Sequence, residues 1–192
     1  MNQAKEKLLI AAGKTFSRYG FYKTSMGEIA KTARKAKGSL YYHFNSKELL
    51  FKEVIASELN FLKEELTIIF NFKHTDSREI LKAYMLKRME ILKASINYQE
   101  TLRPEFYEFY EFLNELKTEM DSWEEIMIIN ILNQGIKNGE LDLPGDIGIH
   151  AEVLVMTLKG LETPFFIKGE YERLESHFDS LISVITKGIS KD

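Results

Sequence analysis

Residues 38–46, with the sequence Gly-Ser-Leu-Tyr-Tyr-His-Phe-Asn-Ser, constrain the fold of this 192-residue chain more than any other segment. On a helix that turns by about 100° per residue, Leu40 and Phe44 fall on one side, while Gly38 and Tyr42 point away from it. The helix therefore has an apolar face for a protein core and an opposite face rich in hydroxyl and phenol groups. Such a face suits the groove and the phosphates of DNA.

Two helices are expected before this segment. The first covers about residues 2–19 and ends at Gly20, a residue suited to a left-handed cap. The second begins at Ser25, whose hydroxyl caps the helix while Glu28, three residues later, completes a capping box. Two short helices joined by a tight turn form a helix-turn-helix, whose second helix enters the major groove of DNA.

Helical periodicity continues through the rest of the chain, and no strand pattern competes with it. Gly139 and the pair Pro144-Gly145 mark expected breaks. We therefore predict an all-α chain, with a three-helix N-terminal domain over residues 1–46 and a helical domain over residues 47–192. The helices expected in the second domain cover about residues 47–71, 76–96, 115–138, 146–167 and 170–189, and another opens at Pro104.

Charge is divided unevenly along the chain. Residues 1–50 carry ten Lys or Arg and three Glu, a local charge of +7, so residues 51–192 carry −10 within the total of −3. A basic head concentrates affinity for a polyanion, and an acidic body discourages unspecific adhesion elsewhere. The chain has no cysteine, which excludes disulfide scaffolds and thiol catalysis. Since it has neither a long apolar run nor a secretion signal, we expect a soluble, cytoplasmic protein.

Four strings, in order and in register, resemble the DNA-binding region of the TetR (tetracycline-repressor) family of bacterial transcription regulators. They lie at residues 16–21, 24–30, 38–44 and 46–50, and the likeness covers about residues 8–52. The resemblance implies a DNA-binding domain over residues 1–46 and an effector-binding and dimerisation domain over residues 47–192. It further implies a repressor that is released from a palindromic double-stranded DNA operator by a small lipophilic effector.

The turn before the third helix departs from this family pattern. Members usually have Gly-Val-Ser there, whereas this chain has Arg34-Lys35-Ala36. The turn therefore lacks the flexible residue, the apolar plug and the serine cap of the recognition helix, and a missing cap typically costs about 1 kcal/mol. We expect a turn that is somewhat mobile without DNA and that brings two added cations close to the phosphates.

Side-chain chemistry and position in the family pattern together indicate the DNA contacts. Lys37 and Tyr42 are best placed to reach base edges, since lysine donates to guanine acceptors and an aromatic ring contacts a thymine methyl group. Gly38 leaves room for the backbone to approach. An alternative for Tyr41 and His43 is that they cover the small core. The remaining expected contacts, with phosphate or sugar, come from Thr24, Ser25, Lys35, Ser39, Tyr41, His43 and Lys47.

Residues 104–113 are rich in aromatic residues, whose spacing spreads the rings around a helix rather than along one stripe. Some of these rings must face a cavity, an interface or water. Acids in the same segment favour an aromatic or lipophilic cation as the effector; alternatively, the rings lie in the core and the acids on a solvated face. The effector pocket that the resemblance implies is expected to be lined by Met85, Met89, Phe106, Phe109, Trp123, Met127 and Asn130.

The last two helices present broad apolar faces at helical spacing. These faces either pack within one chain or, as in the TetR family, pair with a second subunit as a four-helix bundle. Because a helix-turn-helix that reads a palindrome needs two copies, we predict a homodimer through these helices. The apolar positions are Val153, Leu154, Met156, Leu158 and Leu161 on one helix, and Leu174, Phe178, Leu181, Ile182 and Ile185 on the other.

No motif for catalysis or metal binding is present. The four histidines are scattered without metal-ligand spacing, and the chain has neither a phosphate-cradling glycine loop nor a nucleophile elbow. We therefore expect no enzyme activity, no cofactor, no metal and no membrane partner. Two alternatives to an effector-released repressor stay open. One is a dimeric DNA-binding regulator controlled by a protein partner, and the other is a ligand-binding helical module whose basic head lies on anionic membranes.

Overall fold

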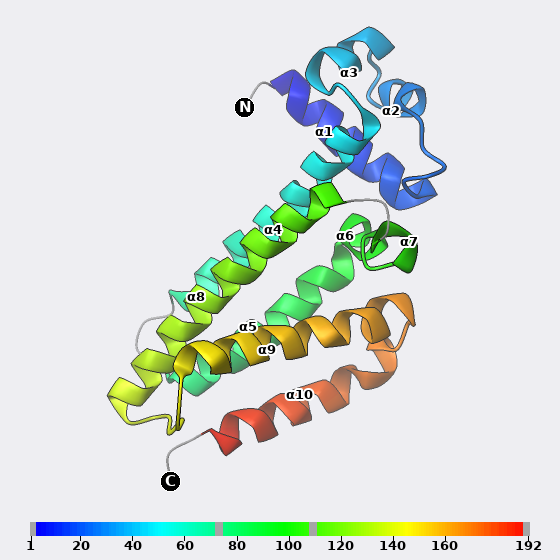
Figure 1. Ribbon diagram of the computed structural model, residues 1–192. Coiled ribbons are helices and arrows are strands. Elements are labelled where there is room, and N and C mark those ends of the chain that lie inside the picture. The colour runs from blue at the N-terminus through cyan, green and yellow to red at the C-terminus, as the bar shows by residue number, and fades with distance from the viewer. Residues whose placement is uncertain (1–2, 72–74, 108–110, 190–192) are drawn as a thin grey trace. The chain divides into compact units, whose positions relative to one another are not determined.

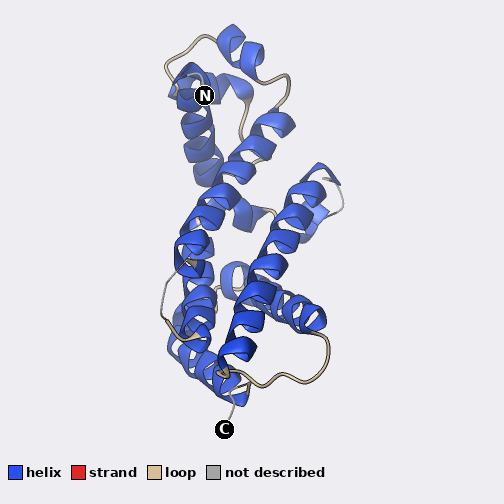
Figure 2. Ribbon diagram, turned by 90° about the vertical axis from the view of Figure 1, so that its left-hand side faces the viewer, coloured by secondary structure: helices blue, strands red, loops and turns tan. Residues whose placement is uncertain are grey.

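The computed structural model describes residues 3–71, 75–107 and 111–189. These residues form helices and loops and contain no strand (Figure 2), which confirms the predicted all-α fold. No helix among them is both long and apolar enough to cross a membrane. In chain order (Figure 1) the elements are α1 (Gln3–Tyr19), α2 (Met26–Thr32), α3 (Lys37–His43), α4 (Lys47–Phe70), α5 (Ser77–Ala94), α6 (Ile96–Glu100), α7 (Pro104–Tyr107), η1 (Glu111–Leu113), α8 (Asn114–Asn138), α9 (Ile147–Glu162), η2 (Thr163–Ile167) and α10 (Tyr171–Gly188).

The helix predicted over residues 76–96 is in fact two helices, α5 and α6. Ser95 separates them with non-helical backbone angles, φ −86° and ψ 69°. Glu58 on α4 stabilises the start of α6, because its carboxylate accepts hydrogen bonds from Tyr98 N and from Asn97 Nδ2, both at 2.7 Å. Burial raises the pKa of Glu58, and these two hydrogen bonds only partly oppose that effect. The break depends on a residue on another helix, so the local sequence pattern does not reveal it.

The chain forms two compact units. Unit 1 comprises residues 1–61 and 95–113, and unit 2 comprises residues 62–94 and 114–192. The helix α4 contributes its first part to unit 1 and its second part to unit 2. The predicted functional boundary between residues 46 and 47 stays a prediction, because these units are defined by packing.

The core of unit 1 is aromatic. Phe21 lies among Phe16, Phe51 and Phe106, whose ring centroids are 5.8, 4.9 and 5.6 Å from its own. All four side chains are buried. Aromatic pairs at such distances contribute about 0.5–1.5 kcal/mol each beyond the burial of their area. The cluster therefore fastens α7 to the helices of the helix-turn-helix head.

A buried ion-pair network joins three helices in unit 2. Arg88 on α5 donates from Nε to Glu124 on α8 and from Nη2 to Glu162 on α9, both at 2.8 Å. Tyr84 donates its hydroxyl hydrogen to the same Glu124 at 2.7 Å. Burial opposes the charge of Arg88, but the two carboxylates outweigh burial and raise the pKa of Arg88 well above its ordinary value.

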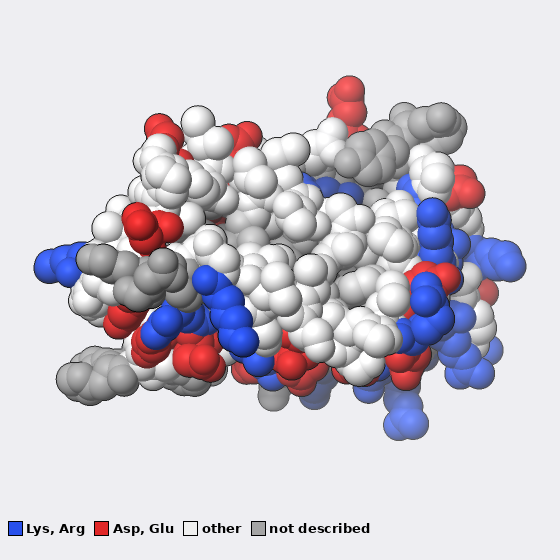
Figure 3. Space-filling model, turned by 90° about the horizontal axis from the view of Figure 1, so that it is seen from below, with Lys and Arg blue, Asp and Glu red and all other residues white. Residues whose placement is uncertain are grey.

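Exposed apolar side chains line the outward faces of α9 and α10. On α9, Ile149, Val153 and Met156 are 60, 55 and 62% exposed, and on α10, Leu181 and Val184 are 50 and 66% exposed. Figure 3 views the molecule from below, and uncharged atoms cover the middle of that face while charged side chains gather toward its edges. Some of the predicted apolar positions are instead buried within the chain, namely Leu158, Phe178 and Ile182.

Candidate DNA interface and ligand pocket

The start of α2 has the predicted capping box. Ser25 Oγ accepts a hydrogen bond from Glu28 N at 3.3 Å, and the Glu28 carboxylate accepts one from Ser25 N at 2.7 Å. Thr24 is 3% exposed and donates its hydroxyl hydrogen to the Gly20 carbonyl at 2.7 Å. Ser25, the first of these two predicted phosphate ligands, is exposed. The side chain of Thr24, the second, is buried and hydrogen-bonded within unit 1.

The helix α3 has the two faces that the sequence predicts. Leu40 and Phe44 are 0 and 3% exposed and pack into unit 1. Tyr42 on the opposite side is 83% exposed, and Tyr41 is 44% exposed. A Cβ atom added at Gly38 would meet no atom within 4 Å. The outer face of α3 is thus open over a full turn, which is the accessibility that a groove-reading helix requires.

The predicted lysine contacts differ in whether their side chains are exposed or already bound within the protein. Lys35 and Lys37 are exposed, and Lys37 Nζ lies 5.7 Å from the centroid of the Tyr41 ring. Lys47 is already engaged, since its Nζ donates to the Phe21 carbonyl at 3.0 Å and lies 4.2 Å from the Phe21 ring centroid. Lys47 therefore fixes the loop before α2, and its phosphate contact stays a prediction.

The two remaining predicted DNA contacts, Ser39 and His43, are half-buried. The His43 ring lies edge-on to the Tyr42 ring, with centroids 5.0 Å apart. His43 therefore supports Tyr42 from the side. Its own contact with DNA stays a prediction.

The turn between α2 and α3 bears a measurable conformational penalty. Ala36 precedes α3 without any side-chain cap, as predicted. Arg34 adopts φ +53°, the left-handed region that residues with a Cβ atom disfavour. The glycine that family members usually have at this position would adopt the same angles without that penalty.

Replacing Arg34 by glycine is therefore expected to raise the free energy of unfolding by about 1 kcal/mol. Urea denaturation followed by circular dichroism measures this change. Lys31→Gly is the matched control, because Lys31 is an exposed cation inside α2 and glycine in a helix lowers stability by about 1 kcal/mol relative to good helix formers. An Arg34→Gly chain no more stable than wild type would contradict the strain at this turn.

A contact that sequence reasoning missed lies behind the helix-turn-helix. Gly20 ends α1 with φ +80°, as predicted, and the next residue, Phe21, donates its backbone N–H to Glu100 Oε1 on α6 at 2.9 Å. A Cβ atom at Gly20 would lie 3.1 Å from the same oxygen. Glu100 therefore positions the loop that leads into α2. No local sequence signal could have revealed a pairing across 79 residues.

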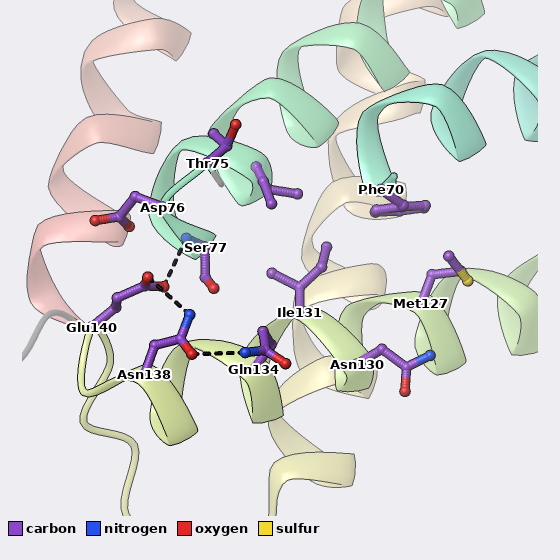
Figure 4. A pocket seen from close by; sticks show the side chains of 11 residues that line it. Phe70, Thr75, Asp76, Ser77, Met127, Asn130, Ile131, Gln134, Asn138 and Glu140 are labelled. Carbon is purple, nitrogen blue, oxygen red and sulfur yellow. Dashed lines mark hydrogen bonds between the residues drawn. The ribbon is translucent and has the colours of Figure 1, made fainter. Parts of the chain in front are cut away.

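Unit 2 contains a pocket of about 780 Å³, formed by the end of α4, the start of α5 and the C-terminal half of α8 (Figure 4). Its size lies in the range of small-molecule sites. Among the described residues, no group of three or more His, Cys, Asp or Glu is arranged to hold a metal ion. The pocket is lined by Phe70, Thr75, Asp76, Ser77, Ile80, Met127, Asn130, Ile131, Gln134, Asn138 and Glu140.

This pocket brings together two of the predicted effector contacts, Met127 and Asn130. Trp123 does not line the pocket but contacts one of its lining residues, with its ring centroid 5.7 Å from that of Phe70. The other predicted contacts are elsewhere: Met85 and Met89 are fully buried, Phe106 belongs to the aromatic core of unit 1, and Phe109 lies outside the described residues. The polar wall, which includes Asp76 and Glu140, was not predicted.

Comparison with known proteins places the head in a family. The family model described as "Bacterial regulatory proteins, tetR family" matches residues 8–54. HTH-type transcriptional regulator QacR of Staphylococcus aureus is 27% identical over 190 residues, which cover 97% of this chain and 98% of that protein. HTH-type transcriptional repressor KstR2 of Rhodococcus jostii is 30% identical over 141 residues, which cover 70% of this chain and 66% of that protein.

Solved structures extend the likeness to the whole chain. The crystal structure of a transcriptional regulator from Cytophaga hutchinsonii superposes with a TM-score of 0.79 at 28% identity and covers 97% of this chain and 98% of that one. FadR from Bacillus subtilis, crystallised with stearoyl-CoA, shares the fold with a TM-score of 0.77 at 19% identity, over 96% of this chain and 98% of that one. The chain therefore belongs to the TetR family of bacterial regulatory proteins and is a DNA-binding transcriptional regulator.

Proposed function

We propose that this regulator is a cytoplasmic, homodimeric repressor that leaves a palindromic operator when unit 2 binds a small effector. The observation that carries the DNA-reading part is the open face of α3, where Tyr42 is 83% exposed and Gly38 has free space around it. In this proposal Lys37 and Tyr42 reach base edges, while Ser25, Lys35 and Tyr41 contact the phosphates and sugars.

The spacing of exposed apolar residues supports a second copy of the chain as partner. Ile149, Val153, Met156 and the exposed Gly160 follow one another at intervals of four, three and four residues, so they share one stripe of α9. Solvent-exposed stripes of this kind are typical of interfaces between subunits. A two-fold dimer presents two α3 helices to successive major grooves, about 34 Å apart or a multiple of that distance.

The pocket in unit 2 supports a small effector. A relative of the same fold was crystallised with a small molecule, and the pocket here is large enough for one. Because α4 contributes residues to both units, a shift in its second part is passed on through a continuous helix. A ligand that prefers one arrangement of unit 2 lowers operator affinity by the ratio of its affinities for the two states.

Tyr42→Ala is expected to lower affinity for the operator by about 1–2 kcal/mol, roughly 5- to 30-fold, and to leave affinity for scrambled DNA almost unchanged. Fluorescence anisotropy with the intergenic DNA that flanks the gene, at several salt concentrations, measures both affinities. Tyr19→Ala is the matched control, because Tyr19 on α1 is also exposed, at 52%, but lies outside the proposed contacts. Equal losses on both DNAs, or equal losses in both variants, would contradict base reading by Tyr42.

A further inference from the structure

We infer that the pocket of Figure 4 binds an amphipathic organic cation, meaning a positively charged nitrogen carried on an apolar aromatic body. This inference names the chemical class of the effector, and it therefore rests on the effector part of the proposed function. It is drawn from the walls of the pocket, which differ sharply in polarity from one side to the other.

One side of the pocket is apolar and preformed. Phe70, Ile80, Met127 and Ile131 contribute it from α4, α5 and α8. The Phe70 ring packs against two other rings, with its centroid 5.3 Å from that of Tyr84 and 5.7 Å from that of Trp123. A flat apolar body packs well against such a wall, and an aromatic ring face also attracts a cation placed within about 6 Å of its centroid.

The other side of the pocket carries two carboxylates. Hydrogen bonds from Arg78 hold the pKa of Asp76 below its ordinary value, and hydrogen bonds from Ser77 do the same for Glu140. Both groups are therefore ionised at neutral pH. None of the side chains that line the pocket is a lysine or an arginine, although Arg78 Nε donates to Asp76 Oδ1 at 2.9 Å.

Glu140 is hydrogen-bonded by uncharged groups at the pocket wall, and the nearby cation Arg78 also interacts with its charge. Its carboxylate accepts hydrogen bonds from Ser77 N at 2.9 Å and from Asn138 Nδ2 at 3.1 Å, both of them uncharged donors. Gln134 Nε2 in turn donates to Asn138 Oδ1 at 2.7 Å, so this row of amides is oriented toward the carboxylate (Figure 4). The polar wall thus offers negative charge and amide oxygens to a bound molecule.

The charge of the polar wall selects among ligands that fit the same space. A ligand anion would be placed beside two carboxylates, and a neutral ligand without hydrogen-bond donors would gain nothing from them. Because Arg78 is paired with Asp76, the two carboxylates and this guanidinium together carry one net negative charge. A cation gains from that charge and from the Phe70 ring. Asp76 and Glu140 also cap α5, because they accept hydrogen bonds from its first N–H groups, namely those of Arg78 and Ser77. The experiment must separate charge from capping.

Isothermal titration calorimetry of the full chain with three probes of similar shape makes this separation. The probes are 1-methylquinolinium, its neutral isostere 1-methylnaphthalene, and the anion 1-naphthoate. The cation is expected to bind about tenfold more tightly than the neutral isostere, and the anion more weakly than both. Filling the space with Met127→Trp is expected to remove binding of all three probes.

Two substitutions remove charge and keep a hydrogen-bond acceptor. Glu140→Gln and Asp76→Asn are each expected to weaken binding of 1-methylquinolinium about threefold to fivefold and to leave 1-methylnaphthalene unaffected. Asp142→Asn is the matched control, because Asp142 is exposed and does not line the pocket but changes the net charge equally. Circular dichroism of each variant reports whether the capping of α5 survives.

Three results would overturn the inference: equal binding of the cation and the neutral isostere, tighter binding of the anion, or cation binding that neither Glu140→Gln nor Asp76→Asn weakens. Calorimetry needs no DNA, so these outcomes are independent of operator reading. If the cation binds as expected but leaves operator affinity unchanged, the ligand class stands and release by this ligand is excluded. If the operator is read but no cation binds, the ligand class alone fails.

Discussion

Replacing Arg88 by methionine is expected to lower the free energy of unfolding by about 3–5 kcal/mol. Arg88, Glu124 and Glu162 are 2, 0 and 1% exposed, so the substitution removes from two buried carboxylates the guanidinium that is hydrogen-bonded to both. Removing one partner of a buried ion pair is much more destabilising than replacing the entire group by apolar residues. Urea denaturation followed by circular dichroism, at one fixed protein concentration, measures the change.

Two controls make this result specific. Lys82→Met on the same helix breaks a partly exposed ion pair, Lys82 Nζ to Asp179 Oδ1 at 3.2 Å, and is expected to lower stability by less than about 1 kcal/mol. A triple variant, Arg88→Met with Glu124→Leu and Glu162→Leu, is expected to recover most of the lost stability. If the free energy of unfolding of Arg88→Met alone lies within about 1 kcal/mol of the wild-type value, the loss is no larger than that of an exposed ion pair. The network would then not hold α5, α8 and α9 together.

Introducing glutamate at both Val153 and Val184 is expected to convert the dimer to a monomer and to lower operator affinity by about 100-fold or more. Both side chains are more than half exposed, 55 and 66%, so the fold of each chain is retained. In the proposed interface four new carboxylates would meet in a two-fold dimer, and like charges in contact oppose association. A monomer binds only one half-site and loses the gain from two linked contacts, typically about 10²- to 10⁴-fold.

Sedimentation velocity and fluorescence anisotropy measure the two parts of this prediction. Ile68→Glu is the matched control, because Ile68 on α4 is also exposed, at 57%, but lies on neither α9 nor α10. A double variant that remains dimeric would show that these helices do not form the interface. A monomeric variant with unchanged operator affinity would instead contradict the need for two linked half-sites.

Features with a local sequence signal were predictable. Ser25 and Glu28 form their capping box because both partners lie within one helical turn. Gly20 and Gly139 end α1 and α8 with φ +80° and +74°, angles that glycine adopts without strain. The two faces of α3 follow from helical period alone, with Leu40 at 0% and Tyr42 at 83% exposure.

Features built from distant residues were not predictable in this way. Glu100 reaches Phe21 across 79 residues and Glu162 reaches Arg88 across 74. Helical period shows that such a residue is helical, but it does not identify the partner. Helical period also does not identify the packing partners of aromatic residues, so it did not predict that Phe106 packs in the core of unit 1. In the pocket, Asp76 and Glu140 meet only because α5 begins beside the end of α8.

Selection from a random library of double-stranded DNA, followed by sequencing of the bound fragments, tests most directly whether α3 reads sequence in a dimer. A random library contains every short half-site sequence, so the selection works wherever the operator lies in the genome. The expected result is an enriched inverted repeat with half-site centres about 34 Å or a multiple apart, which Tyr42→Ala no longer enriches. Bound DNA without any shared motif, or the same motif enriched by Tyr42→Ala, would contradict the assignment of α3 as the recognition helix.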